Sequence, residues 1–115
     1  MEYIIIGGKR LSGEVRISGN KNSVFPCMAA ALLTEEDIIL ENVPDIRDVE
    51  VLLEMLEELG VRTDKKGDNV RLNAKNLKNS TLPVSLSSKL RGSMVLVGGL
   101  LGRLGKARFH HPGGD

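Results

Sequence analysis

The sequence contains few aromatic residues and a single cysteine, and both shortages limit its chemistry. Aromatic side chains make up 3% of the 115 residues, so a hydrophobic core must be built from aliphatic side chains. Cys27 is the only cysteine, which excludes an internal disulfide bond and a zinc site built from cysteines. So little cysteine agrees with a reducing cytosol, and we expect a cytoplasmic protein.

The sequence also lacks an excess of charge of either sign and any long apolar run. Its 16 basic and 15 acidic residues give a formal net charge of +1, which provides no general attraction to nucleic acids or anionic membranes. The longest apolar stretch, residues 94–101, is far shorter than the roughly 20 residues that span a bilayer. The N-terminus does not have the pattern of a signal peptide. We therefore expect neither a nucleic acid nor a membrane as a partner.

Hydrophobic periodicity predicts strands and helices that alternate along one domain at most. Strands are expected at residues 3–6, 14–17, 38–43 and 107–111, a hairpin from residues 61–63 and 70–72, and helices at residues 22–33, 46–59 and 85–104. Residues 14–72 then follow the order β-α-β-α-β-β, which indicates an α/β or α+β fold. The same order begins again after this unit and does not finish, so we expect the natural domain to be longer than this chain.

The expected helices also allow predictions about burial and capping. Apolar residues recur at helical spacing in the second helix (Val49, Leu52, Leu53, Leu56 and Leu59), with Asp45 and Gly60 as the expected caps. The helix at residues 85–104 is apolar on most sides and contains four glycines, so we expect it to be central and closely packed. Cys27 lies in an apolar helix and is expected to be an inert core residue.

Residues 18–23, between an expected strand and an expected helix, form the first candidate site. A helix N-terminus offers free N–H groups and partial positive charge, Gly19 permits close approach of an anion, and Lys21 adds a full charge. The segment is therefore suited to a phosphate or carboxylate. The alternative is an ordinary turn in which Asn20 caps the helix and Lys21 is solvated. No Walker-type or dinucleotide fingerprint supports a generic nucleotide fold.

Three further segments carry residues suited to a site. Arg91 and Lys89 place two cations near the start of the last expected helix, where the alternative is a solvated basic end. Asp115 follows two glycines, and such a loop can carry a proton donor, although a plain turn explains the same residues. His110 and His111 are adjacent in an expected strand and would point to opposite faces, so we expect no metal site there.

In combination, these segments resemble the start of the UDP-N-acetylglucosamine enolpyruvyl transferases. The resemblance covers essentially the whole chain and rests on the runs GEVRISGNKNS (13–23), AAALL (29–33), NVPDIRDV (42–49), LEELG (56–60), LRGS (90–93) and PGGD (112–115). The sister family, 5-enolpyruvylshikimate-3-phosphate synthase, shares the fold but usually has a serine after the lysine. The Lys21-Asn22 pair therefore favours the sugar-nucleotide enzyme.

The resemblance implies a fold of two similar domains, each built from three βαβαββ units around buried helices in an inside-out α/β barrel. This chain would hold one complete unit and part of a second. Residues 1–17 would form strands that pack partly with the C-terminal domain, and residues 18–115 would form an incomplete N-terminal domain. Strands left unpaired in this way are open to self-association.

The resemblance also implies a reaction and the residues that serve it. The family transfers the enolpyruvyl group of phosphoenolpyruvate to the 3-hydroxyl of UDP-N-acetylglucosamine, with release of phosphate, in cytoplasmic peptidoglycan precursor synthesis. It needs no metal or organic cofactor. By position, Lys21 would bind phosphoenolpyruvate and assist catalysis, Asn22 would contact the sugar nucleotide, and Arg91 would add positive charge.

Three readings of the function follow. The first is an enzyme fragment that carries part of an active site and is inactive alone, because the substrates bind between two domains. The second is a stand-alone anion-binding or assembly module, in which Lys21 and Arg91 hold a phosphate without catalysis. The third is a fragment of the sister shikimate-pathway enzyme, which predicts no affinity for uridine nucleotides.

Asp115 generates the first testable prediction. By the resemblance, most family members have a cysteine at this position on a mobile loop, where it acts in proton transfer and is alkylated by the antibiotic fosfomycin. A carboxyl group can relay protons but offers no thiolate to the drug. A full-length form should therefore stay active in fosfomycin, whereas cysteine-bearing members are labelled. Covalent labelling of Asp115 by the drug, detected by mass spectrometry, would refute this prediction.

Overall fold

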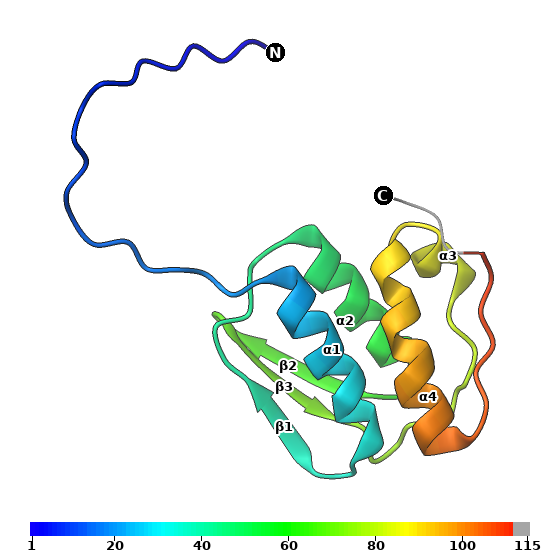
Figure 1. The fold of residues 1–115 in the computed structure, drawn as a ribbon. Helices are drawn as coiled ribbons and strands as arrows, with labels where there is room; N and C mark the ends of the chain where they lie inside the picture. Colours follow the sequence, from blue (N-terminus) through cyan, green and yellow to red (C-terminus); the bar gives the residue numbers. More distant parts are fainter. Residues whose placement is uncertain (112–115) are drawn as a thin grey trace.

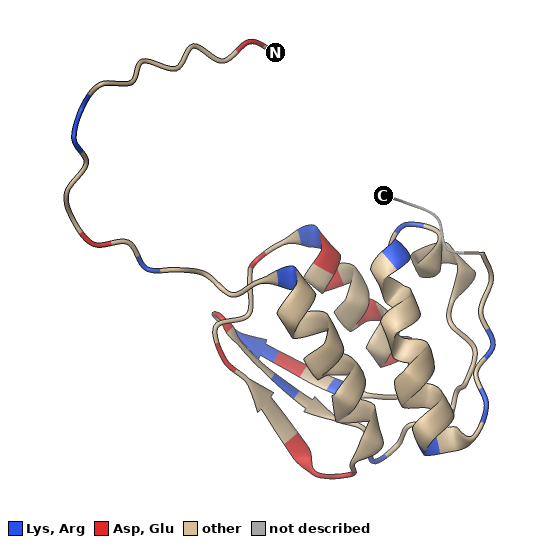
Figure 2. Ribbon diagram, in the orientation of Figure 1, with Lys and Arg blue, Asp and Glu red and all other residues tan. Residues whose placement is uncertain are grey.

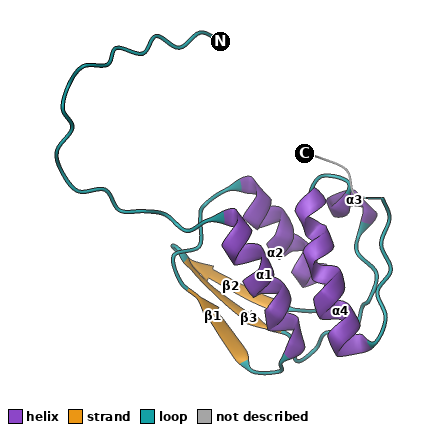
Figure 3. Cartoon of the chain, in the orientation of Figure 1, coloured by secondary structure: helices purple, strands orange, loops and turns teal. Residues whose placement is uncertain are grey.

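The computed structural model describes residues 1–111, in which a three-stranded antiparallel sheet is covered on one face by helices (Figure 1). The elements are α1 (Lys21–Ala30), η1 (Ala31–Leu33), β1 (Asp37–Leu40), α2 (Arg47–Leu59), β2 (Arg62–Lys66), β3 (Asn69–Asn73), α3 (Val84–Ser87), η2 (Arg91–Val95) and α4 (Leu96–Leu104). α1 and α2 lie next to the sheet, and α4 packs against α1 and η1 (Figure 3). The expected mixed α/β architecture is confirmed.

The sheet has the order β1-β3-β2, so the predicted hairpin forms and its second strand is central. Val70 and Leu72 of β3 are fully buried beneath the helices, while the neighbouring Arg71 points to solvent. This alternation is typical of an antiparallel sheet with one face in the core and one in water. Gly67 has a φ of 61° in the hairpin turn, a conformation that glycine adopts without strain.

α2 is the element that the sequence pattern predicted best. All five residues of its apolar stripe are buried, and Gly60 ends the helix in the left-handed conformation with a φ of 102°. The predicted cap at the other end is wrong, because Ile46 occupies the N-cap position without a side-chain hydrogen bond. Asp45 instead accepts a hydrogen bond from Lys65 at 2.5 Å, and this contact lowers the pKa of its carboxyl group.

The N-terminal residues 1–20 are extended and contain no strand, so the strands predicted at residues 3–6 and 14–17 are absent (Figure 1). A strand needs a partner for its backbone N–H and C=O groups, and within residues 1–111 no segment pairs with these residues. Their apolar side chains remain exposed. The end of the segment contacts the body, through an ion pair between Arg16 and Asp68 at 3.1 Å and through contacts of Ile17 and Gly19 with Asn42.

The helix predicted at residues 85–104 is also wrong as a single element, because the chain breaks between α3 and η2. Leu90 is extended, with φ −142° and ψ 100°, and this geometry buries its side chain. Leu96, Gly99 and Leu100 of α4 are buried, but Leu101 is half exposed, so the helix is buried on one face only. The strand predicted at residues 107–111 is reduced to one isolated bridge, between Thr81 and Arg108.

Two adjacent glycines in α4 allow a matched stability test. A Cβ atom on Gly99 would lie 2.5 Å from the carbonyl oxygen of Ala29, whereas a Cβ atom on Gly98 would meet nothing within 4 Å. Gly99→Ala should therefore destabilise the fold by about 1–3 kcal/mol through overpacking. Gly98→Ala should stabilise it by about 0.5–1 kcal/mol through helix propensity. Urea denaturation measures both changes, and the same sign for the two variants would contradict the described packing.

Candidate functional site

The N-terminal ends of α1, α2 and η2 gather at one end of the domain, and each begins with a basic residue. Lys21, Arg47 and Arg91 are these first residues, and Figure 2 shows the positive charge at the start of each element. An ion pair between Lys21 and Asp48 joins α1 to α2. α1 also contacts η2, because the ring of Phe25 lies so close to Gly92 that a Cβ atom there would be 2.7 Å from it. The helix dipole adds partial positive charge at the start of α1.

The turn before α1 sets the position of its first residues. Asn20 is the N-cap, with an extended backbone, and its side-chain Oδ1 accepts a hydrogen bond from the backbone N–H of Asn22 at 2.7 Å. Its carbonyl oxygen accepts from Ser23 and Val24 at 3.1 Å each. The cap proposed in the alternative reading of this turn is therefore present. It fixes the start of the helix without occupying the side chain of Lys21.

Lys21 is not freely solvated, because its Nζ lies 2.8 Å from Oδ2 of Asp48 at the start of α2. Both side chains are little more than a third exposed, at 42% and 37%. Such a pair contributes only about 0.2–1 kcal/mol to stability. Its effect is to orient the ammonium group at the shared end of the two helices. Nothing in the sequence indicates this pair, because the two residues lie 27 positions apart.

The other predicted cations and polar groups differ in how available they are. Asn22 and Arg91 are exposed, and no side-chain hydrogen bond from either reaches another residue within 1–111. Arg47 is already occupied: a hydrogen bond to Glu50 at 2.9 Å and the charge of Glu54 raise the pKa of its guanidinium. Lys21, Asn22 and Arg91 therefore lie on adjoining elements as a site requires, and Asp115 lies outside the described residues.

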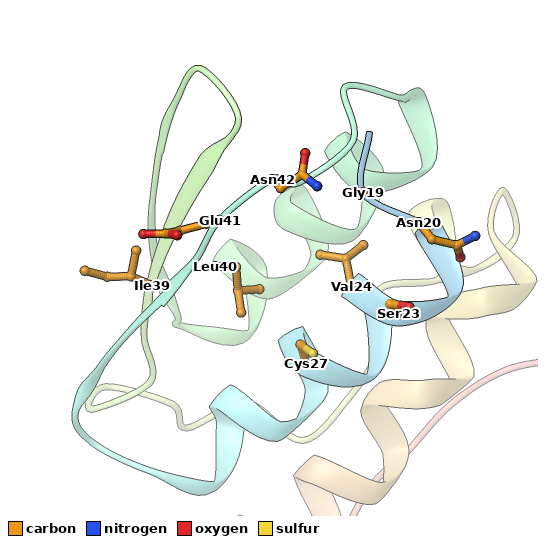
Figure 4. A pocket seen from close by; sticks show the side chains of 9 residues that line it. All are labelled: Gly19, Asn20, Ser23, Val24, Cys27, Ile39, Leu40, Glu41 and Asn42. Carbon is orange, nitrogen blue, oxygen red and sulfur yellow. The ribbon is translucent and has the colours of Figure 1, made fainter. Parts of the chain in front are cut away.

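A cleft of about 520 Å³ opens between α1 and the chain that follows β1 (Figure 4). Polar groups of Asn20, Ser23 and Asn42 line it, together with apolar side chains of α1 and β1 and the carboxylate of Glu41. Cys27 also lines it and is exposed, so the prediction of a buried core cysteine is wrong. The reason is its place on α1, where the buried stripe consists of Val24, Phe25, Met28 and Ala29.

Within residues 1–111, no group of three or more histidine, cysteine, aspartate or glutamate side chains lies close enough together to hold a metal ion. No helix in that part of the chain is both long and apolar enough to cross a membrane.

Comparison with known proteins supplies a family. Residues 5–115 match the family described as EPSP synthase (3-phosphoshikimate 1-carboxyvinyltransferase). The chain is similar to UDP-N-acetylglucosamine 1-carboxyvinyltransferases from Treponema denticola (48% identity over 99% of the chain) and Bradyrhizobium diazoefficiens (44% over 100%). It spans 27% of the length of each of these relatives.

A solved structure agrees with the sequence comparison. The enolpyruvyl transferase NikO from Streptomyces tendae superposes with a TM-score of 0.75 and 35% sequence identity. The match covers 88% of this chain and 24% of NikO. The fold described above is therefore found in an enolpyruvyl transferase.

Asn20 and Asn22 allow the capping geometry to be tested. Asn20→Ala removes the side-chain acceptor at the start of α1 and should destabilise the chain by about 1 kcal/mol. Asn22→Ala removes a side chain without a hydrogen bond to residues 1–111 and should change stability by no more than about 0.5 kcal/mol. Thermal unfolding monitored by circular dichroism gives both values. Equal losses in the two variants would show that Asn20 is not the cap.

Proposed function

The chain belongs to the EPSP synthase family of enolpyruvyl transferases, and from this premise we propose that it is the N-terminal part of a UDP-N-acetylglucosamine enolpyruvyl transferase. The reaction would move the enolpyruvyl group of phosphoenolpyruvate to the 3-hydroxyl of UDP-N-acetylglucosamine and release phosphate. The names of the similar proteins from Treponema denticola and Bradyrhizobium diazoefficiens support the choice of acceptor. The observation that carries the proposal is the half-buried Lys21 at the joined ends of α1 and α2.

Anion binding is what the geometry supports most directly. Phosphoenolpyruvate carries a phosphate and a carboxylate, and UDP-N-acetylglucosamine carries a diphosphate. Lys21 offers an oriented ammonium group, the start of α1 adds the positive end of its helix dipole, and Arg91 adds an unpaired exposed guanidinium among residues 1–111. An arriving anion would compete with Asp48 for Lys21. The ion pair therefore orients the ammonium group and still leaves it able to bind a substrate anion.

The chemistry proceeds by addition and elimination. The 3-oxygen of the sugar bonds to C2 of phosphoenolpyruvate while C3 gains a proton, and the hydroxyl proton leaves. C3 then loses a proton, the C2–O bond to phosphate breaks, and the enol ether double bond forms. Fixed cations stabilise negative charge that develops on the phosphate and carboxylate oxygens. We assign this role to Lys21, contact with the sugar nucleotide to Asn22, and proton transfer to Asp115.

The proposed location and partners follow from the same assignment. An enzyme of peptidoglycan precursor synthesis acts on soluble nucleotide sugars, so we place the protein in the cytoplasm, with phosphoenolpyruvate and UDP-N-acetylglucosamine as substrates. The chain covers about a quarter of the relatives' length, and we expect residues 1–115 alone to be inactive. The second and third readings remain as alternatives to be tested: a binding module without catalysis and an enzyme that uses shikimate 3-phosphate.

Lys21 is the residue to test in the complete protein that contains this sequence. Lys21→Ala should lower kcat for phosphate release by about 10²–10³-fold, because it removes the fixed charge at the reacting anion. Lys65→Ala is the matched control, since it also breaks one Lys–Asp ion pair on the same domain but should leave kcat unchanged. Phosphate release is measured with phosphoenolpyruvate and UDP-N-acetylglucosamine.

The acceptor separates the alternative functions in the same assay. Phosphate release that requires shikimate 3-phosphate and ignores the sugar nucleotide would assign the sister activity. Binding of phosphoenolpyruvate with no release in either case would favour a module without catalysis. Equal kcat values for Lys21→Ala and Lys65→Ala would remove Lys21 from the catalytic machinery.

A further inference from the structure

Asn42 is the one non-glycine residue within 1–111 that has a positive φ, at 55°. It follows β1 and precedes the Val43-Pro44 pair that leads into α2. Asparagine tolerates the left-handed region better than most residues, whereas a β-branched residue there is a true outlier. A conformation of this kind persists when the surrounding structure requires it, which directs attention to what the bent backbone touches.

The bent backbone of Asn42 touches Gly19. A Cβ atom on Gly19 would lie 1.8 Å from the carbonyl oxygen of Asn42 and 3.2 Å from Cδ of Pro44, so the two backbones are in direct contact. The side-chain Nδ2 of Asn42 also donates to the carbonyl oxygen of Ile17 at 3.5 Å, which is a long hydrogen bond. Figure 4 shows Asn42 and Gly19 beside each other in the lining of the cleft.

These contacts hold the segment that leads directly into the candidate site. Gly19 is followed by the cap Asn20 and then by Lys21. Because only one residue separates them, a displacement of the Gly19 backbone would also displace Lys21. The chain on the other side of Asn42 leads to Asp48, the ion-pair partner of Lys21. The loop that contains Asn42 therefore contacts the turn before Lys21 and also leads to Asp48, whose carboxylate orients Lys21.

We infer that Asn42 is a positioning residue for Lys21, acting through its left-handed backbone and the carbonyl contact with Gly19. This inference rests on the proposed function for its link to catalysis. It assigns no contact with substrate to Asn42. The backbone, not the amide side chain, carries the effect, so a residue that accepts a positive φ should replace asparagine.

Two substitutions at position 42 separate the backbone from the side chain in the complete protein. Asn42→Gly keeps access to the left-handed backbone and should leave kcat within about threefold of the original value. Asn42→Val opposes that backbone and should lower kcat by about tenfold or more through misplacement of Lys21. Asn42→Ala, which opposes it less strongly, should fall between the two and serves if the valine variant does not fold.

Gly105→Val is the matched control for strain alone. Gly105 also has a positive φ, at 69°, with nothing within 4 Å of an added Cβ, and it ends α4 at the opposite end of the domain (Figure 1). The Gly105→Val substitution should lower the melting temperature, while kcat measured below that temperature should stay unchanged. In a Lys21→Ala background, Asn42→Val should cause no further loss of kcat, because the group that it positions is absent.

A readout without turnover keeps this inference separate from the proposed function. Labelling of Lys21 by trinitrobenzenesulfonate, followed by peptide mass spectrometry, should be several-fold faster in Asn42→Val than in Asn42→Gly or Gly105→Val. That result supports positioning even in a protein without transfer activity, which would overturn the proposed function alone. The inference is overturned if Asn42→Val labels at the unaltered rate, or if Asn42→Gly loses as much kcat as Asn42→Val.

Discussion

Close packing of α1 is the constraint on which the site depends. The helix buries Val24, Phe25, Met28 and Ala29, and its neighbours in η2 and α4 approach it where Gly92 and Gly99 have no side chain. A helix held this closely cannot turn or slide without overlapping its neighbours. Its first residue is Lys21, so the position of one ammonium group is set by the packing of the whole domain. The Asp48 carboxylate then orients that group from the neighbouring helix.

The parts of the fold that depend on local pattern could be predicted from the sequence. The spacing of apolar residues predicts the buried stripe of α2, and the spacing of apolar and turn residues predicts the β2–β3 hairpin. The predictions fail where a contact between residues distant in the sequence determines the local conformation. Asp45 would cap α2 in isolation but is held by Lys65, and Leu90 leaves the helical conformation to bury its side chain. The apolar residues of segment 3–6 have strand propensity but no partner among the described residues.

The residues of the candidate site also divide into those that the sequence predicts and those that only tertiary contacts reveal. Lys21, Asn22 and Arg91 could be selected from charge, glycine placement and resemblance to a family, and the structure places the elements that carry them side by side. Asp48 and Asn42 could not be selected, because their roles come from contacts with Lys21 and Gly19 that bridge more than twenty positions. The local sequence around Cys27 is apolar, yet the helix turns its side chain into the cleft. Orientation around a helix, and contact between distant loops, are properties of the tertiary packing.

The central claim is that these groups serve enolpyruvyl transfer to a sugar nucleotide. Mass spectrometry of the nucleotide recovered after incubation of the complete protein with phosphoenolpyruvate and UDP-N-acetylglucosamine tests it most directly. The claim predicts a product in which the sugar nucleotide carries one added enolpyruvyl group. Recovery of unaltered UDP-N-acetylglucosamine, under conditions in which the same protein modifies shikimate 3-phosphate or modifies nothing, would contradict it.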